Sequence, residues 1–138
     1  MAQPTQRNGA APAPATLVLG LGVTGAALAR YLAGRGEVAR VADTRAEPPG
    51  LAALPAGFDF VPGPLSVGLL DGIERLLVSP GLADDAGVIT TARRRGIEVA
   101  SDIDLFVAAA AAPLLTVTGS NGKSTVVSMT AAMLTAAG

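Results

Sequence analysis

The chain has 138 residues, with 10 Lys and Arg against 11 Asp and Glu, and it contains no His, Cys or Trp. Without Cys there are no disulfides, thiol nucleophiles or zinc–thiolate sites, and without His there are no imidazole bases or His-ligated metals. A net charge of −1 and an aromatic content of 3% argue against nucleic acid or an anionic membrane as a partner. Lysine chemistry, if any, must come from Lys123, the only lysine.

The first 15 residues are rich in Ala, Pro and Gln and include a single charged side chain, Arg7. They lack the apolar segment of a secretion signal, so residues 1–15 are predicted to be a disordered tail on a cytoplasmic protein. No stretch approaches the ~20 apolar residues that a membrane-spanning helix requires. The length is typical of one domain, or of one domain and part of another.

Short aliphatic runs alternate with helical periodicity over residues 16–100. The runs predict strands at 16–20, 38–42, 58–61, 75–79 and 97–100. The segments between them predict helices at 23–33, 65–72 and 84–95, and a Pro- and Gly-rich loop at 46–57. This alternation is typical of an α/β, Rossmann-like fold with a parallel sheet. Because the carboxyl ends of parallel strands meet at one edge, Gly20, Asp43 and Ser79 should lie close together.

A second unit is predicted to begin near Ser101. A helix over 102–112 should end before Pro113, and a buried strand over 114–118 should follow it. A Gly-rich turn at 119–125 then leads into a helix over 126–137. A strand, loop and helix in this order are typical of the opening of a larger α/β domain.

The first motif is Gly20-Leu-Gly22-Val-Thr-Gly25, which follows a predicted strand and opens a predicted helix. Glycines in this pattern let the backbone approach a diphosphate, whose charge lies at the helix N-terminus. Asp43, 23 residues after Gly20, could accept hydrogen bonds from a ribose or a base. The alternative is a tightly packed turn without a ligand, and the motif does not distinguish NAD, FAD and other diphosphates.

The second motif is Thr118-Gly-Ser-Asn-Gly-Lys-Ser-Thr125. Gly-Lys-Ser between a strand and a helix is typical of a phosphate loop, in which backbone N–H groups and the Lys bind phosphates and the hydroxyl ligates Mg²⁺. The strict pattern needs a glycine at position 117, which is Val117, so this loop is a shortened variant starting at Gly119. The alternative is an exposed Gly–Asn turn with an incidental Lys.

Two other features carry less information. Ser79-Pro80-Gly81 ends a strand where a ligand could bind, but a plain turn is the more common meaning of such a sequence. Asp102 and Asp104 are interpreted as first-turn acids of a helix beside its N-cap.

Six motifs occur in order along the chain: Gly20-Leu-Gly-Val-Thr-Gly25, Asp43-Thr-Arg45, Pro48-Pro-Gly-Leu51, Ser79-Pro-Gly81, Asp102-Ile-Asp-Leu-Phe106 and Thr118-Gly-Ser-Asn-Gly-Lys-Ser-Thr125. Together they resemble the N-terminal part of the Mur ligases, the ATP-dependent amino-acid ligases of peptidoglycan synthesis. The last motif is typical of the whole family. The first two point to the member that adds D-glutamate to UDP-N-acetylmuramoyl-L-alanine.

The resemblance implies that residues 16–100 bind the UDP part of the substrate, and that residues 101–138 begin a truncated ATP-binding central domain. The implied UDP site consists of Gly20, Gly22, Val23, Thr24, Gly25, Asp43, Thr44, Arg45, Ser79, Pro80 and Gly81. In it Val23 and Thr24 would lie by the diphosphate, and Asp43 and Thr44 by the uracil. The implied ATP site consists of Gly119, Ser120, Asn121, Gly122, Lys123, Ser124 and Thr125. Lys123 would be catalytic and Ser124 would lie near Mg²⁺.

The implied reaction activates the substrate carboxylate as an acyl phosphate, from which the amine of D-glutamate displaces phosphate. The resemblance also implies a carbamylated lysine, a metal-ligating Glu and His, and a domain for the amino acid. The chain has one Lys and no His, so we expect a monomeric fragment with no ligase activity alone.

Two other functions are compatible with part of the sequence. A nicotinamide-dependent oxidoreductase would explain the first motif and Asp43, but it leaves the loop around Lys123 without a role. A non-catalytic nucleotide-binding module would use either motif without turnover. Titration with UDP, UDP-sugar, NAD and ATP discriminates among the three.

Overall fold

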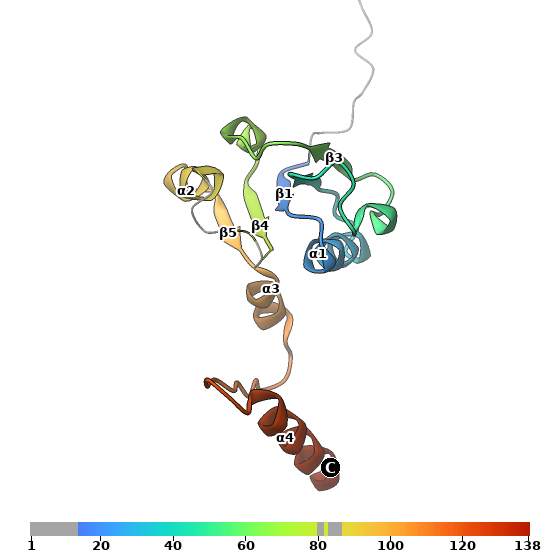
Figure 1. The fold of residues 1–138 in the computed structure, drawn as a ribbon, viewed down its shortest axis with the longest axis vertical. Coiled ribbons are helices and arrows are strands. Elements are labelled where there is room, and N and C mark those ends of the chain that lie inside the picture. The colour runs from blue at the N-terminus through green and yellow to red at the C-terminus, as the bar shows by residue number, and fades with distance from the viewer. Residues whose placement is uncertain (1–13, 80–81, 83–86) are drawn as a thin grey trace, which may run out of the picture. The chain divides into compact units, whose positions relative to one another are not determined.

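The computed structural model divides into two units, Met1–Phe106 and Val107–Gly138. Five parallel strands form the centre of the first unit (Figure 1). The structure describes residues 14–79, 82 and 87–138. The strands are β1 (Thr16–Leu19), β2 (Arg40–Asp43), β3 (Asp59–Pro62), β4 (Arg75–Val78) and β5 (Glu98–Ala100). The α/β, Rossmann-like fold expected from the sequence is therefore confirmed for this unit.

The strand order is β3-β2-β1-β4-β5, and every neighbouring pair is parallel. The chain builds outward from β1 through β2 to β3, then returns to place β4 on the other side of β1. The register pairs Leu19 with Ala42 of β2 and with Val78 of β4. The order in which the chain adds strands thus reverses direction between β1 and β4. This is the point at which open parallel sheets bind ligands.

Alternating side chains of the central strands supply two hydrophobic cores, one on each face of the sheet. Leu17 and Leu19 belong to the core that contains Val88 and Ile89 of α2 (Gly87–Arg94) and Leu70 of the short 3₁₀ helix η2 (Val67–Leu70). Val18 points to the other core. That core contains three residues of α1 (Val23–Gly34): Ala26, Leu28 and Leu32. Both faces of the buried strands are covered, which is why their sequences are continuously apolar.

The predicted helices and strands of this unit are present, with shifted ends. The helix predicted over 65–72 is the 3₁₀ helix η2, and the loop predicted over 46–57 contains a second 3₁₀ turn, η1 (Leu51–Ala53). β2 begins two residues later than predicted because pairing with β1 starts at Arg40. The first residues of the helix predicted over 84–95 lie outside the described residues.

Helix α3 (Asp102–Ala109) begins at a reciprocal cap. The Ser101 N–H donates to Asp104 Oδ2 at 2.7 Å, and the Asp104 N–H donates to Ser101 Oγ at 3.2 Å. This exchange satisfies two N–H groups at the start of the helix, as in a capping box. The helix ends short of the predicted Ala112, because the residue before Pro113 disfavours helical geometry and the Ala run is mostly exposed.

The second unit contains α4 (Lys123–Ala137), which begins three residues earlier than predicted. The strand predicted over 114–118 was wrong for this structure: in the described part of the chain that segment forms no strand. A strand requires a neighbouring backbone to accept and donate its hydrogen bonds. All strand pairs among the described residues belong to the sheet of the first unit.

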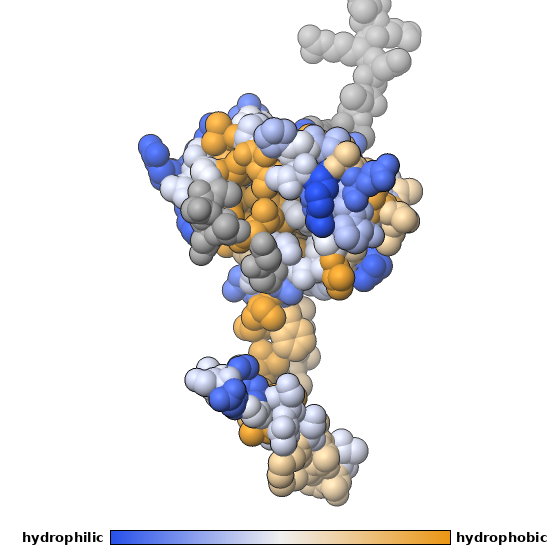
Figure 2. Space-filling view, in the orientation of Figure 1, coloured by the Kyte–Doolittle hydropathy of each residue, from blue (hydrophilic) through white to orange (hydrophobic). Residues whose placement is uncertain are grey.

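Apolar side chains on the second unit are largely exposed. Figure 2 shows uncovered hydrophobic atoms here, and the exposed fractions include 70% for Leu115, 64% for Met133 and 56% for Leu134. Leu115 and Val117 still line a small hollow with Val127 and Leu134 of α4. No helix among the described residues combines the length and hydrophobicity needed to cross a membrane.

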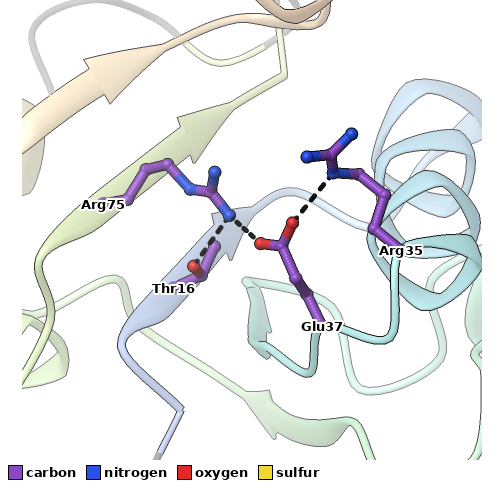
Figure 3. Close-up of polar contacts among 4 residues, drawn as sticks. All are labelled: Thr16, Arg35, Glu37 and Arg75. Carbon is purple, nitrogen blue, oxygen red and sulfur yellow. Dashed lines mark hydrogen bonds and ion pairs between the residues drawn. The ribbon is translucent and has the colours of Figure 1, made fainter.

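A polar cluster lies at the amino-terminal edge of the sheet, where Arg75 at the start of β4 meets Thr16 of β1 and Glu37 (Figure 3). Arg75 Nη2 donates to Thr16 Oγ1 at 3.2 Å and also to Glu37 Oε2. The hydrogen bond from Arg75 lowers the pKa of the Glu37 carboxyl, and Arg35 adds to the effect. The cluster ties the beginnings of β1 and β4 to the connection between α1 and β2.

Replacing Leu77 by Ala should destabilise the first unit. Leu77 lies in β4 with no exposed surface and packs in the core beneath α1. The lost burial and the resulting cavity should lower the free energy of unfolding by about 2–5 kcal/mol, measured by urea denaturation. The control is Val67→Ala at a half-exposed site, with an expected change within about 0.5 kcal/mol. Equal effects of the two substitutions would contradict the assignment of Leu77 to the core.

Candidate functional site

The carboxyl ends of β1, β2 and β4 border a cleft of about 340 Å³. Its lining residues are Gly20, Gly22, Asp43, Thr44, Arg45, Leu65, Ser79 and Leu82. Gly20 follows β1, Asp43 ends β2 and Ser79 follows β4, so positions far apart in the sequence meet at one edge. The cleft thus occupies the point between β1 and β4 where ligands bind in sheets of this topology.

The glycine turn between β1 and α1 depends on two close approaches. Gly20 has a φ of +86°, which disfavours any side chain, and its N–H donates to Ala42 O at 2.8 Å. At Gly25 a Cβ would lie 1.8 Å from the Gly20 carbonyl oxygen, so only glycine fits there. Gly22 is the N-cap of α1, and no side chain among the described residues caps this end. The N–H groups of the first turn are therefore available to an anion.

Asp43 links this turn to the loop after β2. Its side chain is only 4% exposed. Oδ2 accepts the Leu21 N–H at 2.7 Å and Arg45 Nη2 at 2.8 Å. Oδ1 accepts both the backbone N–H and Nε of Arg45 at 2.9 Å. The carboxylate thus fixes the peptide between Gly20 and Leu21 from one side and orients the Arg45 guanidinium from the other.

These bonds set the charges in the cleft. The Arg45 side chain, and then the Leu21 N–H, hold the pKa of the Asp43 carboxyl well below its usual range despite burial. The same hydrogen bond raises the pKa of Arg45, whose side chain is 52% exposed. The pair is therefore a buried carboxylate under a solvent-facing guanidinium, and the cation is the member that an incoming anion meets first.

This geometry gives Asp43 a structural role that the sequence did not suggest, because its carboxylate holds the glycine turn and Arg45 in place. A carboxylate offers about four lone-pair sites, and the four protein hydrogen bonds occupy them. A ligand donor at Asp43 must therefore compete with Arg45, whereas the neighbouring Thr44 is exposed at the cleft. The contact of Asp43 and Thr44 with a uracil stays a prediction.

The other predicted UDP-site residues fall into three groups. Val23 is 85% exposed and borders a separate hollow with Arg30 and Pro49, beside Gly22. Thr24 is partly buried in the first turn of α1, and Gly25 is buried beneath Gly20. Pro80 and Gly81 lie outside the described residues.

Two leucines line the cleft without having been predicted. Leu82 Cδ1 lies 3.1 Å from where a Gly20 Cβ would be, and Leu65 lies in the loop after β3. Neither belongs to a Gly-rich motif, and no local sequence signal distinguishes them from core leucines.

The predicted phosphate loop lies at the start of α4 in the second unit. Gly122, its N-cap, has a φ of +76°, and no side chain in the described part of the chain caps the helix. Lys123 Nζ donates to the Gly119 carbonyl at 2.5 Å, which closes the loop on itself. An ammonium group has three donors, so Lys123 can keep this bond and still contact a phosphate. The loop and the free end of α4 therefore fit a phosphate group.

A metal ion would find few protein ligands. Within the described residues no group of three or more His, Cys, Asp or Glu side chains could hold one. Ser124, in the first turn of α4, offers a single hydroxyl. Such a site fits Mg²⁺ only as a nucleotide complex, because Mg²⁺ commonly takes most of its ligands from water and phosphates.

A family model described as "Mur ligase MurD-like, N-terminal domain" matches residues 14–101. The chain belongs to the MurD-like family. The matched residues contain the five-stranded sheet, the glycine turn and every described residue that lines the cleft.

Curated relatives of this MurD-like chain are named UDP-N-acetylmuramoylalanine–D-glutamate ligase. The protein of this name from Marinobacter nauticus is 46% identical over 126 aligned residues, and the match covers 89% of the chain and 28% of the relative. Those from Nitrosococcus oceani and Photorhabdus laumondii are 45% and 42% identical over 91% and 88% of the chain, and again 28% of each relative is matched. The chain thus spans little more than a quarter of these relatives.

Replacing Asp43 by Asn should change how stability depends on pH. Because the folded state holds the Asp43 pKa below its unfolded value, its contribution is present at neutral pH and is lost as the pH falls below about 4. We expect the variant to be less stable at pH 7 by about 1.5–3 kcal/mol. The difference should shrink by about 1 kcal/mol at pH 3, measured by urea unfolding.

The matched control is Asp59→Asn, at an exposed position of β3. Its side chain makes no contact of this kind in the described structure, so the variant should lose no more than about 0.5 kcal/mol of stability at pH 7. A constant difference between the chain and Asp43→Asn from pH 7 to pH 3 would contradict the proposed depression of the Asp43 pKa.

Proposed function

We propose that the first unit binds the uridine diphosphate part of UDP-N-acetylmuramoyl-L-alanine, as the substrate domain of a cytoplasmic ligase that adds D-glutamate during peptidoglycan precursor synthesis. The observation that carries the proposal is the cleft between β1 and β4, which opens onto an uncapped glycine turn in a MurD-like chain. The names of relatives 41–46% identical to the chain support the choice of substrates.

The chemistry of the cleft suits a nucleoside diphosphate. Its volume of about 340 Å³ is within the usual range of small-molecule sites. The diphosphate would accept hydrogen bonds from the first-turn N–H groups after Gly22, where the helix dipole favours negative charge. The base would lie near Thr44, and the positively charged Arg45 guanidinium would line the cleft beside it. The apolar side chains of Leu65 and Leu82 would cover the remaining surface of the ligand.

The loop 119–125 is proposed to hold the phosphates of ATP. The backbone N–H groups at the start of α4 and Lys123 would bind them, and Ser124 would contribute a ligand to Mg²⁺. Bound Mg²⁺ would supply charge neutralisation on the phosphates. In this scheme residues 16–100 are the UDP-binding domain, and residues 101–138 are the beginning of the ATP-binding domain.

The proposed reaction has two steps. An oxygen of the substrate carboxylate bonds to the γ-phosphorus of ATP as the bond to ADP breaks, which gives an acyl phosphate. The D-glutamate amine then forms an amide at the acyl carbon, loses a proton and releases inorganic phosphate. Lys123 would stabilise the negative charge on the transferred phosphoryl group, since a fixed cation there favours the transition state.

UDP should bind saturably to the first unit, measured by calorimetry or by NMR titration. Replacing the exposed Thr44 by Ala should raise the dissociation constant about five-fold, because one hydrogen bond of about 1 kcal/mol is lost. The control Thr90→Ala, exposed on α2, should bind like the unmodified chain. Saturable binding of NAD without binding of UDP would instead favour an oxidoreductase domain.

ATP binding to the second unit should depend on Lys123. Lys123→Met removes the ammonium group but keeps the length of the side chain, and the dissociation constant for ATP should rise about 10- to 100-fold. Thr135→Ala, at the far end of α4, is the control and should leave the constant unchanged. Phosphate release with D-glutamate is expected from neither protein, because the chain has one Lys and no His. Equal ATP affinities of Lys123→Met and Thr135→Ala would refute the phosphate-loop proposal.

A further inference from the structure

The Pro48-Pro-Gly-Leu51 segment forms a tight turn outside the cleft. The Leu51 N–H donates to the Pro48 carbonyl at 3.0 Å. Gly50 has φ −84° and ψ −5°, the values of the third residue of a type I turn, and Pro49 occupies the second position, which proline favours. Pro48 is buried, and Leu51 packs against the core beneath α1. The turn is therefore preorganised by proline and anchored to the core.

The conformation of this turn does not require glycine at position 50. A φ of −84° is open to any residue, and the third position of a type I turn accepts most of them. The restriction comes from the surroundings. A Cβ on Gly50 would lie 2.9 Å from the Leu21 carbonyl oxygen, 3.0 Å from Ala26 Cβ and 3.1 Å from the Gly22 carbonyl oxygen. Position 50 is thus a contact point between the turn and the glycine motif.

Gly50 also makes a hydrogen bond to that motif. Its N–H donates to the Leu21 carbonyl at 3.0 Å. The Leu21 N–H is bound by Asp43 Oδ2 at 2.7 Å, and the Leu21 side chain is fully buried. Leu21 is therefore held at its N–H, its carbonyl and its side chain, and the residues on either side of it, Gly20 and Gly22, line the cleft.

We propose that Gly50 is a positioning residue for the nucleotide site. The absence of a side chain lets its backbone approach the glycine turn, and its N–H binds the Leu21 carbonyl, which holds the turn in the conformation that binds a diphosphate. The inference rests on the proposed UDP site. Asp43 restrains the turn from the cleft side, and Gly50 restrains it from the outside. The two restraints act on opposite ends of one residue, so loss of either should loosen the backbone on which the phosphates lie.

The test is Gly50→Ala in the 138-residue chain, with Gly34→Ala as the matched control. Gly34 ends α1 at an exposed position, where an added Cβ would meet only open space among the described residues. The readouts are the amide shift and hydrogen exchange of Leu21 by NMR, the dissociation constant for UDP, and thermal unfolding. We expect Gly50→Ala to shift the Leu21 amide, speed its exchange and weaken UDP binding about five- to ten-fold. Gly34→Ala should leave the Leu21 amide and the UDP dissociation constant unchanged, and it should not lower the unfolding temperature.

A second variant keeps the test decisive if Gly50→Ala does not fold. Pro49→Ala adds no atoms at the contact and only relaxes the turn, so its effects should have the same direction and a smaller size. The role of Gly50 would be overturned if the folded Gly50→Ala and Pro49→Ala variants had the same UDP affinity and the same Leu21 amide shift and exchange rate as Gly34→Ala. Failure of the unmodified chain to bind UDP would overturn the proposed function instead, and the Leu21 amide would still report whether Gly50 restrains the turn.

Discussion

The carboxylate of Asp43 is the constraint on which the candidate site depends. A single buried group ends β2, accepts the Leu21 N–H of the turn after β1, and fixes Arg45 through three further hydrogen bonds. A charge buried to this degree is tolerated only when it is paired and fully hydrogen-bonded. The hydrogen bonds that stabilise this charge also fix the backbone around the cleft. The charges and the shape of the cleft therefore depend on the same set of bonds.

The parallel sheet makes this interaction possible. β2 lies beside β1, so the end of one strand faces the turn that follows the other. β4 lies on the opposite side of β1 and brings Ser79 to the same edge. The polar cluster around Arg75 is at the other edge of the sheet, where β1 and β4 begin. Ion pairs therefore connect the elements at the amino ends of the strands, and the cleft lies at their carboxyl ends.

Sequence patterns predicted the architecture well because each of its signals is local. Aliphatic runs marked the strands, and Gly20, Asp43 and Ser79 marked their ends, which the structure brings together. The four bonds of Asp43 and the contact of Gly50 with Leu21 could not be predicted, since they depend on how distant loops meet. The strand predicted over 114–118 failed for a related reason: its residues suit a strand, but pairing requires a partner that propensity does not reveal.

The chemistry of Lys123 has a practical consequence. It is the only lysine of the chain, and it is exposed at the start of α4. Apart from the α-amino group, no other amine in the protein can react with an acylating or alkylating reagent. Lys123 is therefore the single side-chain amine that such labelling detects, without any engineered residue, and the degree of labelling at Lys123 reports on whether a bound anion shields that loop.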